Sequence, residues 1–184
     1  MQRSVRGEVD RWTLPTVWLH TIMLLLFIVM FVLAEAMDWT HGSTKGAIIG
    51  VHKSIGVLIF LLAWIRLLWN LNHTGPRPIG TKVQQKAALG VHHLLYLLML
   101  VIPVSGYFMS LAHGRSVGFF GLFTLPSLMG ARPAMKETLE NVHAFLAYSL
   151  LVIASGHGAL ALYHHFVLKD ETLVRMNPFS AKRS

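Results

Sequence analysis

Residues 141–166 read NVHAFLAYSLLVIASGHGALALYHHF, the stretch of the chain that is most informative about its fold. It is almost wholly apolar and exceeds the roughly 20 residues that a helix needs to cross a bilayer. His143 and His157 lie 14 residues apart within it. At about 1.5 Å and about 100° per residue, both imidazoles lie on one helix face, about 21 Å apart. Because an ionisable side chain in lipid is costly, the pair indicates a functional site at two depths in the membrane.

The composition indicates a membrane protein built from helices. Of the 184 residues, 54% are hydrophobic and 13% are charged, and the apolar residues fall into four long runs. A semi-apolar segment at residues 117–129 is too short to cross and is predicted to lie on the membrane surface. We therefore predict an all-α membrane protein, an up-and-down four-helix transmembrane bundle. It forms one domain of residues 1–184, with spans near residues 14–36, 47–69, 82–111 and 138–167.

Histidine is the metal-binding residue type that this sequence offers. The chain contains no cysteine, which excludes disulfides, iron–sulfur clusters, covalent c-type haem attachment and thiolate zinc sites. It contains 11 histidines, and the nitrogen of a neutral imidazole is an axial ligand for haem iron. If the protein binds a redox metal, imidazoles must therefore ligate it.

The positive charges are divided unequally between the two ends of the predicted bundle. One side carries only Lys45, Lys53, Arg115, Arg132 and Lys136. The other side, which includes both termini, carries Arg3, Arg6, Arg11, Arg66, Arg77, Lys82, Lys86, Lys169, Arg175, Lys182 and Arg183. Lys and Arg are enriched on cytoplasmic loops, so both termini are predicted in the cytoplasm. This asymmetry accounts for the net charge of +8, and no nucleic-acid partner is expected.

The orientation assigns a depth to each histidine of the spans. His20 lies early in the first span and therefore at the inner level, whereas His52 lies early in the second span and at the outer level. The fourth span enters from outside, so His143 lies at the outer level and His157 at the inner level. The predicted pairs are His20 with His157 and His52 with His143. Two haems b, each ligated by two imidazoles, would then be stacked inside the bundle.

Small residues beside these histidines allow two interpretations. Gly156 and Gly158 flank His157, and Gly50 and Gly56 bracket His52. Missing side chains would leave room for a flat macrocycle. Glycines also let transmembrane helices approach each other, so the sequence leaves both explanations open.

A second polar group is expected beside the inner haem. His164 follows His157 by seven residues and lies on nearly the same helix face, closer to the cytoplasm. His92 and Arg66 reach the same side from the third and second spans. A quinone headgroup needs a hydrogen-bond donor and a proton source, and imidazole supplies both. For Arg66, extension of the side chain to the membrane surface is an equally good explanation.

Several segments together resemble the bacterial cytochrome b561 family, the four-span dihaem membrane proteins. The resemblance covers essentially the whole chain. It rests on the 14-residue separation in the fourth span and on VWLH at 17–20, GVHKSIGVLIF at 50–60, RLLW at 66–69, HHLLYLLMLVIPVSGYFM at 92–109 and YHHFVLKDETLVRMNP at 163–178.

The resemblance implies ligation of haem b iron by His20, His52, His143 and His157, and electron exchange with quinone. His164 matches the position of the quinone-contacting histidine in the superoxide oxidase members, which pass electrons from superoxide to ubiquinone. We therefore expect a superoxide:quinone oxidoreductase in the bacterial inner membrane, with a mildly basic outer face that attracts the anion.

Two alternatives of other classes are open. One is a haem-containing membrane anchor that relays electrons between a periplasmic redox protein and the quinone pool. The other is a transition-metal transporter, since imidazole also binds zinc and copper. Intramembrane carboxylates are almost missing from the spans, with Glu35 only at a span end, which makes the transporter the weakest of the three.

Overall fold

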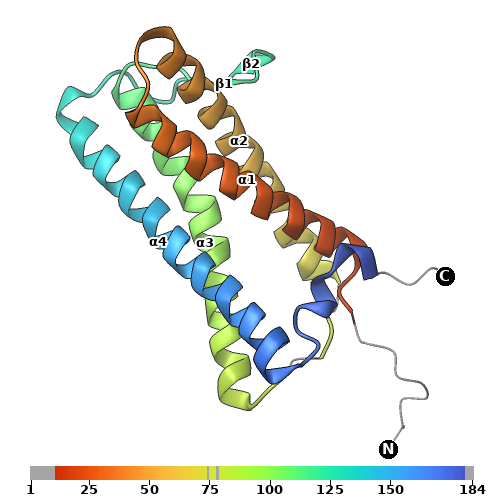
Figure 1. The fold of residues 1–184 in the computed structure, drawn as a ribbon. Helices are drawn as coiled ribbons and strands as arrows, with labels where there is room; N and C mark the ends of the chain where they lie inside the picture. Colours follow the sequence, from red (N-terminus) through yellow and green to blue (C-terminus); the bar gives the residue numbers. More distant parts are fainter. Residues whose placement is uncertain (1–10, 74, 78, 181–184) are drawn as a thin grey trace, which may run out of the picture.

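The computed structural model describes residues 11–73, 75–77 and 79–180, and it confirms the four-helix architecture. The long helices are α1 (Leu14–Asp38), α2 (Gly42–Asn72), α3 (Lys82–Ala112) and α4 (Lys136–Tyr163) (Figure 1). All four are long and apolar enough to cross a membrane. The helix α2 begins at Gly42, five residues before the predicted span. Its first turn is polar, so the apolar run does not mark where the helix begins.

Local sequence explains where several of these helices begin and end. Pro15 lies in the first turn of α1, where a missing backbone N–H costs no hydrogen bond. Thr81 and Gln84 form a capping box at the start of α3, with each side chain accepting from the other's backbone N–H. At its C-terminal end, α4 continues into a π-helix (His164–Leu168). This helix ends at Lys169, a residue with a positive φ.

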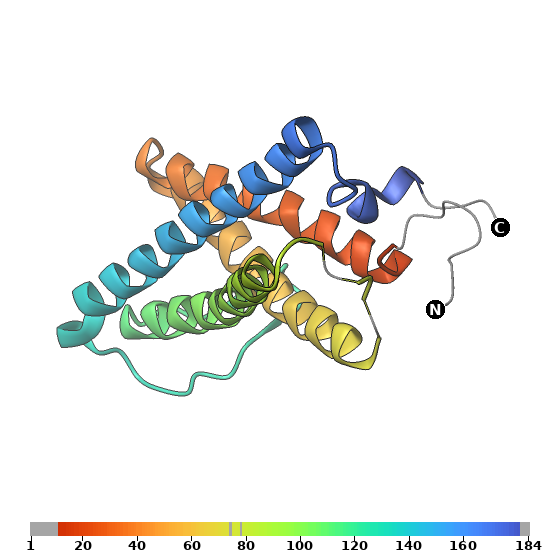
Figure 2. The ribbon, with the colours of Figure 1, turned by 90° about the horizontal axis from the view of Figure 1, so that it is seen from below.

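The helices pack in chain order and leave α4 partly unpartnered. In the described residues, α1 packs on α2, α2 on α3, and α3 on α4, whereas α4 makes no comparably close packing with α1 or α2. Figure 2 shows the bundle from a second direction, in which α4 runs obliquely across α1 and α2. Trp12 donates a backbone hydrogen bond to Arg175 (3.4 Å), so the two described ends of the chain lie together.

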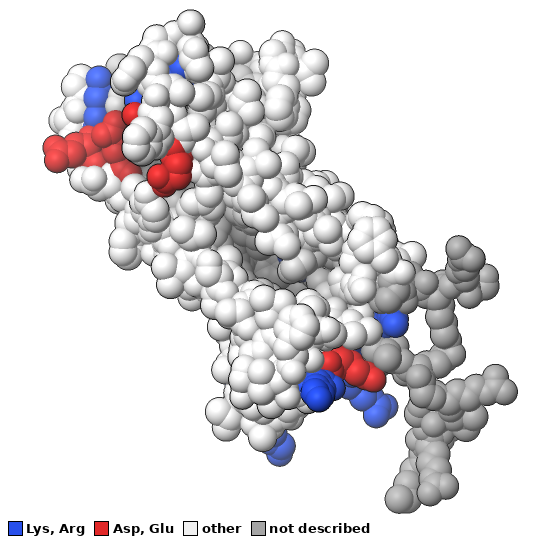
Figure 3. All heavy atoms as spheres, in the orientation of Figure 1, with Lys and Arg blue, Asp and Glu red and all other residues white. Residues whose placement is uncertain are grey.

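The buried core is small and lies between α1, α2 and α3. It consists of Met23, Ile55, Ile59, Ala63 and Met99. Most other large apolar side chains of the helices are exposed, as expected for a surface that faces lipid. On the face drawn in Figure 3, the charged side chains gather at the two ends and the middle is uncharged.

The connection between α3 and α4 folds over the first half of α2, the half predicted to face outward. It contains a two-stranded hairpin of β1 (Gly118–Phe119) and β2 (Phe123–Thr124). Ser54 of α2 holds this hairpin, because its hydroxyl donates to Gly118 O (3.3 Å) and accepts from Phe120 N (3.0 Å). Residues 117–129 thus contain no membrane-crossing helix.

Candidate haem and quinone sites

The structure brings together the two histidine pairs predicted from depth. His52 and His143 form the outer tier, with ring centroids 6.4 Å apart and ring planes at 74°. His20 and His157 form the inner tier, also with centroids 6.4 Å apart, at 56°. Each tier joins α4 to a helix on which it does not pack closely, α2 for the outer tier and α1 for the inner tier.

This separation fits one metal ion between each pair of rings. Imidazole nitrogens bind transition metals at about 2 Å, so two ligands on opposite sides of one ion have ring centroids roughly 6 Å apart. The observed 6.4 Å in both tiers is close to that value and too long for direct ring stacking. The donor set is two neutral imidazoles per tier, which is the axial set of a b-type haem.

The outer tier opens into a cavity of about 430 Å³, within the range of small-molecule and cofactor sites. Its walls are mostly apolar and include Phe27, Met30 and Met99 beside the two outer-tier histidines. Cβ atoms added at Gly50, Gly156 or Gly158 would meet nothing within 4 Å, so these glycines do not serve close packing between the described helices. Of the two interpretations of the small residues, this favours room for a flat group.

Two residues of α3 position the imidazole of His143. Ser105 donates its hydroxyl proton to Ile102 O (2.7 Å), so its oxygen accepts from His143 Nδ1 at 2.9 Å. The proton is therefore on Nδ1, and Nε2 is left free to bind iron. A Cβ at Gly106 would lie only 2.9 Å from His143 Cε1, so the ring occupies the space of a missing side chain. By contrast, His52 Nδ1 is buried and has no hydrogen-bond partner among the described residues.

The inner tier has a cationic neighbour. The ring of His92 lies 5.2 Å from that of His157. Arg66 lies on α2, 14 residues and about 21 Å along the helix from His52, at the level of this tier. Arg66 also lies over the ring of Tyr96, 5.6 Å from its centroid. The structure thus brings Arg66 and His92 together with the inner tier, as predicted.

His164 has a different partner, Asp170. His164 Nδ1 donates to Asp170 Oδ2 at 2.5 Å, and Asp170 Oδ1 accepts from Thr172 N at 2.9 Å. Burial acts to raise the pKa of Asp170, but the hydrogen bonds from His164 and Thr172 outweigh it and lower the pKa to about 2. The carboxylate is therefore charged at neutral pH and fixes the imidazole. In the described part of the chain His164 contacts Asp170 and Tyr163, and it makes no hydrogen bond or ring contact with Arg66 or His92.

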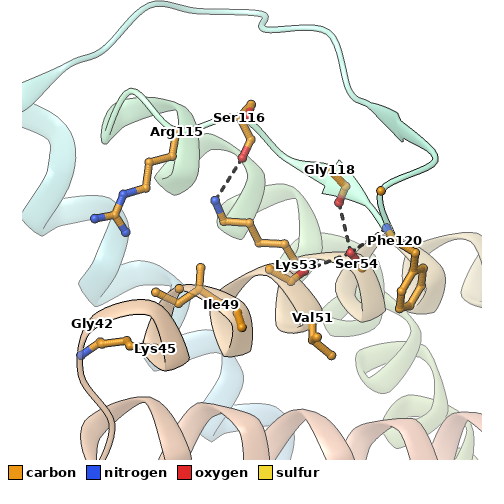
Figure 4. Close-up of a pocket in the computed structure, with 14 residues that line it drawn as sticks. Gly42, Lys45, Ile49, Val51, Lys53, Ser54, Arg115, Ser116, Gly118 and Phe120 are labelled. Atoms are coloured by element: carbon orange, nitrogen blue, oxygen red, sulfur yellow. Dashed lines mark hydrogen bonds between the residues drawn. The ribbon is translucent and has the colours of Figure 1, made fainter.

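A basic pocket of about 620 Å³ lies at the outer end, next to the outer cavity (Figure 4). Lys45, Lys53 and Arg115 line it, and no carboxylate does. Lys53 donates to Ser116 O at 3.1 Å. Lys53 and Arg115 also line the outer cavity, so they separate the solvent-facing pocket from the outer tier.

Sequence reasoning did not find three of these residues: Ser105, Gly106 and Asp170. The first two act across a helix interface, and no pattern within α3 marks them. Asp170 lies in the segment YHHFVLKD, six residues after His164. A turn expected after the end of the helix is the sequence feature that could have indicated its contact with His164.

Comparison with known proteins places the chain among membrane cytochromes. The family model for prokaryotic cytochrome b561 matches residues 11–178, nearly the whole chain. The chain belongs to the prokaryotic cytochrome b561 family. Cytochrome b561 homolog 2 of Escherichia coli K12 is 36% identical over 165 residues, covering 86% of this chain and 85% of that protein. The probable superoxide oxidase CybB of Yersinia pestis is 32% identical over 164 residues, covering 87% and 92%.

A third relative, cytochrome b561 homolog 1 of Escherichia coli K12, is 28% identical and covers 92% of this chain and 98% of its own length. Membership of the cytochrome b561 family confirms the predicted resemblance, a multi-pass bacterial membrane location, membrane electron transfer and haem b as the cofactor.

Proposed function

We propose that the protein is a dihaem b cytochrome of the inner membrane that oxidises periplasmic superoxide and reduces ubiquinone, a superoxide:quinone oxidoreductase. The observation that carries the proposal is the presence of two imidazole pairs, each with a 6.4 Å centroid separation, at two depths of one bundle. His52 and His143 would ligate the outer haem iron, and His20 and His157 the inner one. The distribution of Lys and Arg supports cytoplasmic termini.

The haems, when bound, would supply reversible one-electron chemistry at each tier. The chain's own contribution is to hold both sites in a dry bundle, to fix the ligands and to set the electrostatic field around them. The 14 residues between the histidines of α4 separate the two tiers by about 21 Å along the helix axis. The two tiers thus lie near opposite sides of the bilayer core.

The basic outer pocket supports superoxide as the electron donor. Three cations surround it without a carboxylate, so the local field attracts a small anion and raises its encounter rate. Two superoxide anions each lose one electron and leave as dioxygen. One quinone gains these two electrons and two protons and becomes the quinol. The name of the Yersinia pestis relative, probable superoxide oxidase, supports the same donor.

We place the quinone headgroup at His164, with His92 and Arg66 as weaker contributors. The carboxylate of Asp170 holds Nδ1–H of His164, which leaves Nε2 available for a quinone oxygen. Imidazole is a common general acid, so His164 would also deliver a proton to the reduced quinone. The position at the cytoplasmic end of α4 gives access to protons from the cytoplasm.

A second candidate is a membrane anchor that receives electrons from a periplasmic redox protein. The outer hairpin favours it, because Leu122 is 77% exposed and follows Gly121, which lines the basic pocket. Exposed apolar groups outside the lipid are a feature of docking surfaces. In this case the protein would relay electrons only when its partner is present.

One experiment separates the two candidates. The purified protein in nanodiscs, with haem quantified from its reduced-minus-oxidised spectrum, receives superoxide from a chemical generator and ubiquinone in the lipid. Two haems b per chain and formation of ubiquinol without any other protein support the superoxide oxidase. Two haems without ubiquinol formation favour the relay. One haem or none contradicts both.

A further inference from the structure

Arg66 occupies the inner-tier position on α2. It follows His52 by 14 residues, the separation that also joins the two ligand histidines of α4. Fourteen residues advance a helix by about 21 Å and return it to within about 40° of the same face. Its guanidinium lies over Tyr96 of α3, four residues after His92, whose ring lies 5.2 Å from that of His157. The helix α2 therefore presents an imidazole to the outer tier and a guanidinium to the inner tier.

This guanidinium has no anionic partner among the described residues. None of the ion pairs there includes Arg66, and its Nε is buried without a hydrogen-bond partner. The hydroxyl oxygen of its neighbour Tyr96 accepts a hydrogen bond from Asn70 Nδ2 (2.7 Å). In a protein environment a unit charge acts about four times more strongly than in bulk water. The uncompensated cation therefore favours the more negative, reduced state of a redox group in the inner tier.

In the outer tier, a hydrogen bond to His143 has the opposite effect on the reduction potential. His143 donates its Nδ1–H to Ser105, whose own proton is committed to Ile102 O. A hydrogen bond from the second nitrogen of a ligating imidazole makes the first a stronger electron donor. A stronger donor stabilises the oxidised metal and lowers the reduction potential. No comparable hydrogen bond to His20 or His157 is present in the described part of the chain.

The cations at the outer end act less strongly on their tier. Lys53 is bound to Ser116 O, and Arg115 is exposed, so both line the solvent-facing pocket. Water and salt screen charges in such a position. Arg66 lies instead within an apolar span, where screening is weak.

We propose that Arg66 and Ser105 give the two tiers different reduction potentials, higher at the inner tier and lower at the outer tier, so that electrons run inward. Arg66 supplies a positive charge that stabilises the reduced state of the inner site, and Ser105 is a positioning residue for His143. The inference rests on the proposed two-haem arrangement and names the residues that set its two potentials.

The test is a spectroscopic redox titration of the purified protein in nanodiscs. His52→Leu and His20→Leu, which each remove one predicted ligand, identify the signals of the outer and inner haems. In the unaltered protein the inner midpoint potential should be the higher one. Arg66→Met should shift the inner reduction equilibrium at least tenfold toward the oxidised form, which is 59 mV for one electron. Arg66→Lys should restore most of that difference.

Ser105→Ala should shift the outer equilibrium at least threefold toward the reduced form, and Ser105→Thr, which keeps the hydroxyl, should not. Arg132→Gln removes an exposed outer cation and Ser149→Ala an exposed hydroxyl of α4, and both should leave the potentials unchanged.

Equal potentials, a higher outer potential, or an Arg66→Met shift shared by both haems would overturn the inference while leaving two haems in place. Absence of a second haem in the unaltered protein would instead overturn the proposed function. If Arg66→Met fails to retain haem, the order of potentials and the Ser105 variants still decide the question.

Discussion

The sharpest prediction concerns Gly106, which leaves room for the imidazole of His143. A methyl group at this position would lie 2.9 Å from His143 Cε1 and 3.2 Å from Nδ1. Ordinary carbon contacts lie near 3.5–4 Å, so Gly106→Ala must displace the ring by about 0.6 Å or more. Metal–ligand distances tolerate only about 0.2 Å, and the hydrogen bond to Ser105 would be strained as well. We expect the outer haem to be lost or loosely bound and the inner haem to be kept.

The assay is haem quantitation combined with the redox titration. Gly106→Ala should contain close to one haem per chain, with the inner component unchanged. Gly90→Ala, on the same helix, is the matched control, because a Cβ there meets nothing within 4 Å. If Gly106→Ala retains two haems and an unchanged outer potential, His143 is not held by its contacts with α3 in the way described here.

Four further predictions follow from the same geometry. His143→Leu should remove the outer haem alone, seen as half the haem content in the visible spectrum. His164→Gln should slow ubiquinone reduction at least tenfold while the haem spectrum is unchanged. Because the pKa of Asp170 is lowered from 3.8 to about 2, its charge should stabilise the fold above pH 3.8, with this contribution lost as the pH falls toward 2; thermal unfolding of Asp170→Asn should lack this dependence. Replacing Lys53 and Arg115 by Gln should lower the superoxide-driven rate several-fold and weaken its dependence on salt.

Each of these tests has a control within the chain. His165→Gln, next to His164, should leave quinone reduction unchanged, and Lys86→Gln, which removes a cation from the opposite end of the bundle, should leave the salt dependence unchanged. Loss of the inner rather than the outer haem in His143→Leu would show that the pairing is wrong. Quinone reduction at full rate in His164→Gln would move the quinone site elsewhere.

The helices and the two tiers could be predicted because they depend on repeating features of the chain. The apolar runs locate the lipid-facing segments, and the 14-residue spacing of His143 and His157 fixes two depths on one face. The alternation of direction between successive spans then assigns His20 and His52 to opposite depths. These inferences need only helix geometry and the positions of the charges.

The remaining features depend on contacts between distant segments. The apolar run does not show that α2 begins at Gly42, since the helix continues beyond the lipid into polar residues. The hairpin at residues 118–124 depends on Ser54, more than 60 residues earlier in the chain. Ser105 matters only because α3 packs on α4 at the level of His143. No local pattern in the sequence records such pairings.

The helix α4 supplies one histidine to each tier, and this has a mechanical consequence. A bilayer that becomes thinner or thicker changes the tilt of membrane helices and the way in which they slide past each other. Because both α4 histidines belong to one continuous hydrogen-bonded helix, their separation is set by the rise per residue and not by interhelical packing. Lipid composition should therefore alter access to the two ends of the protein far more than the spacing of its redox centres.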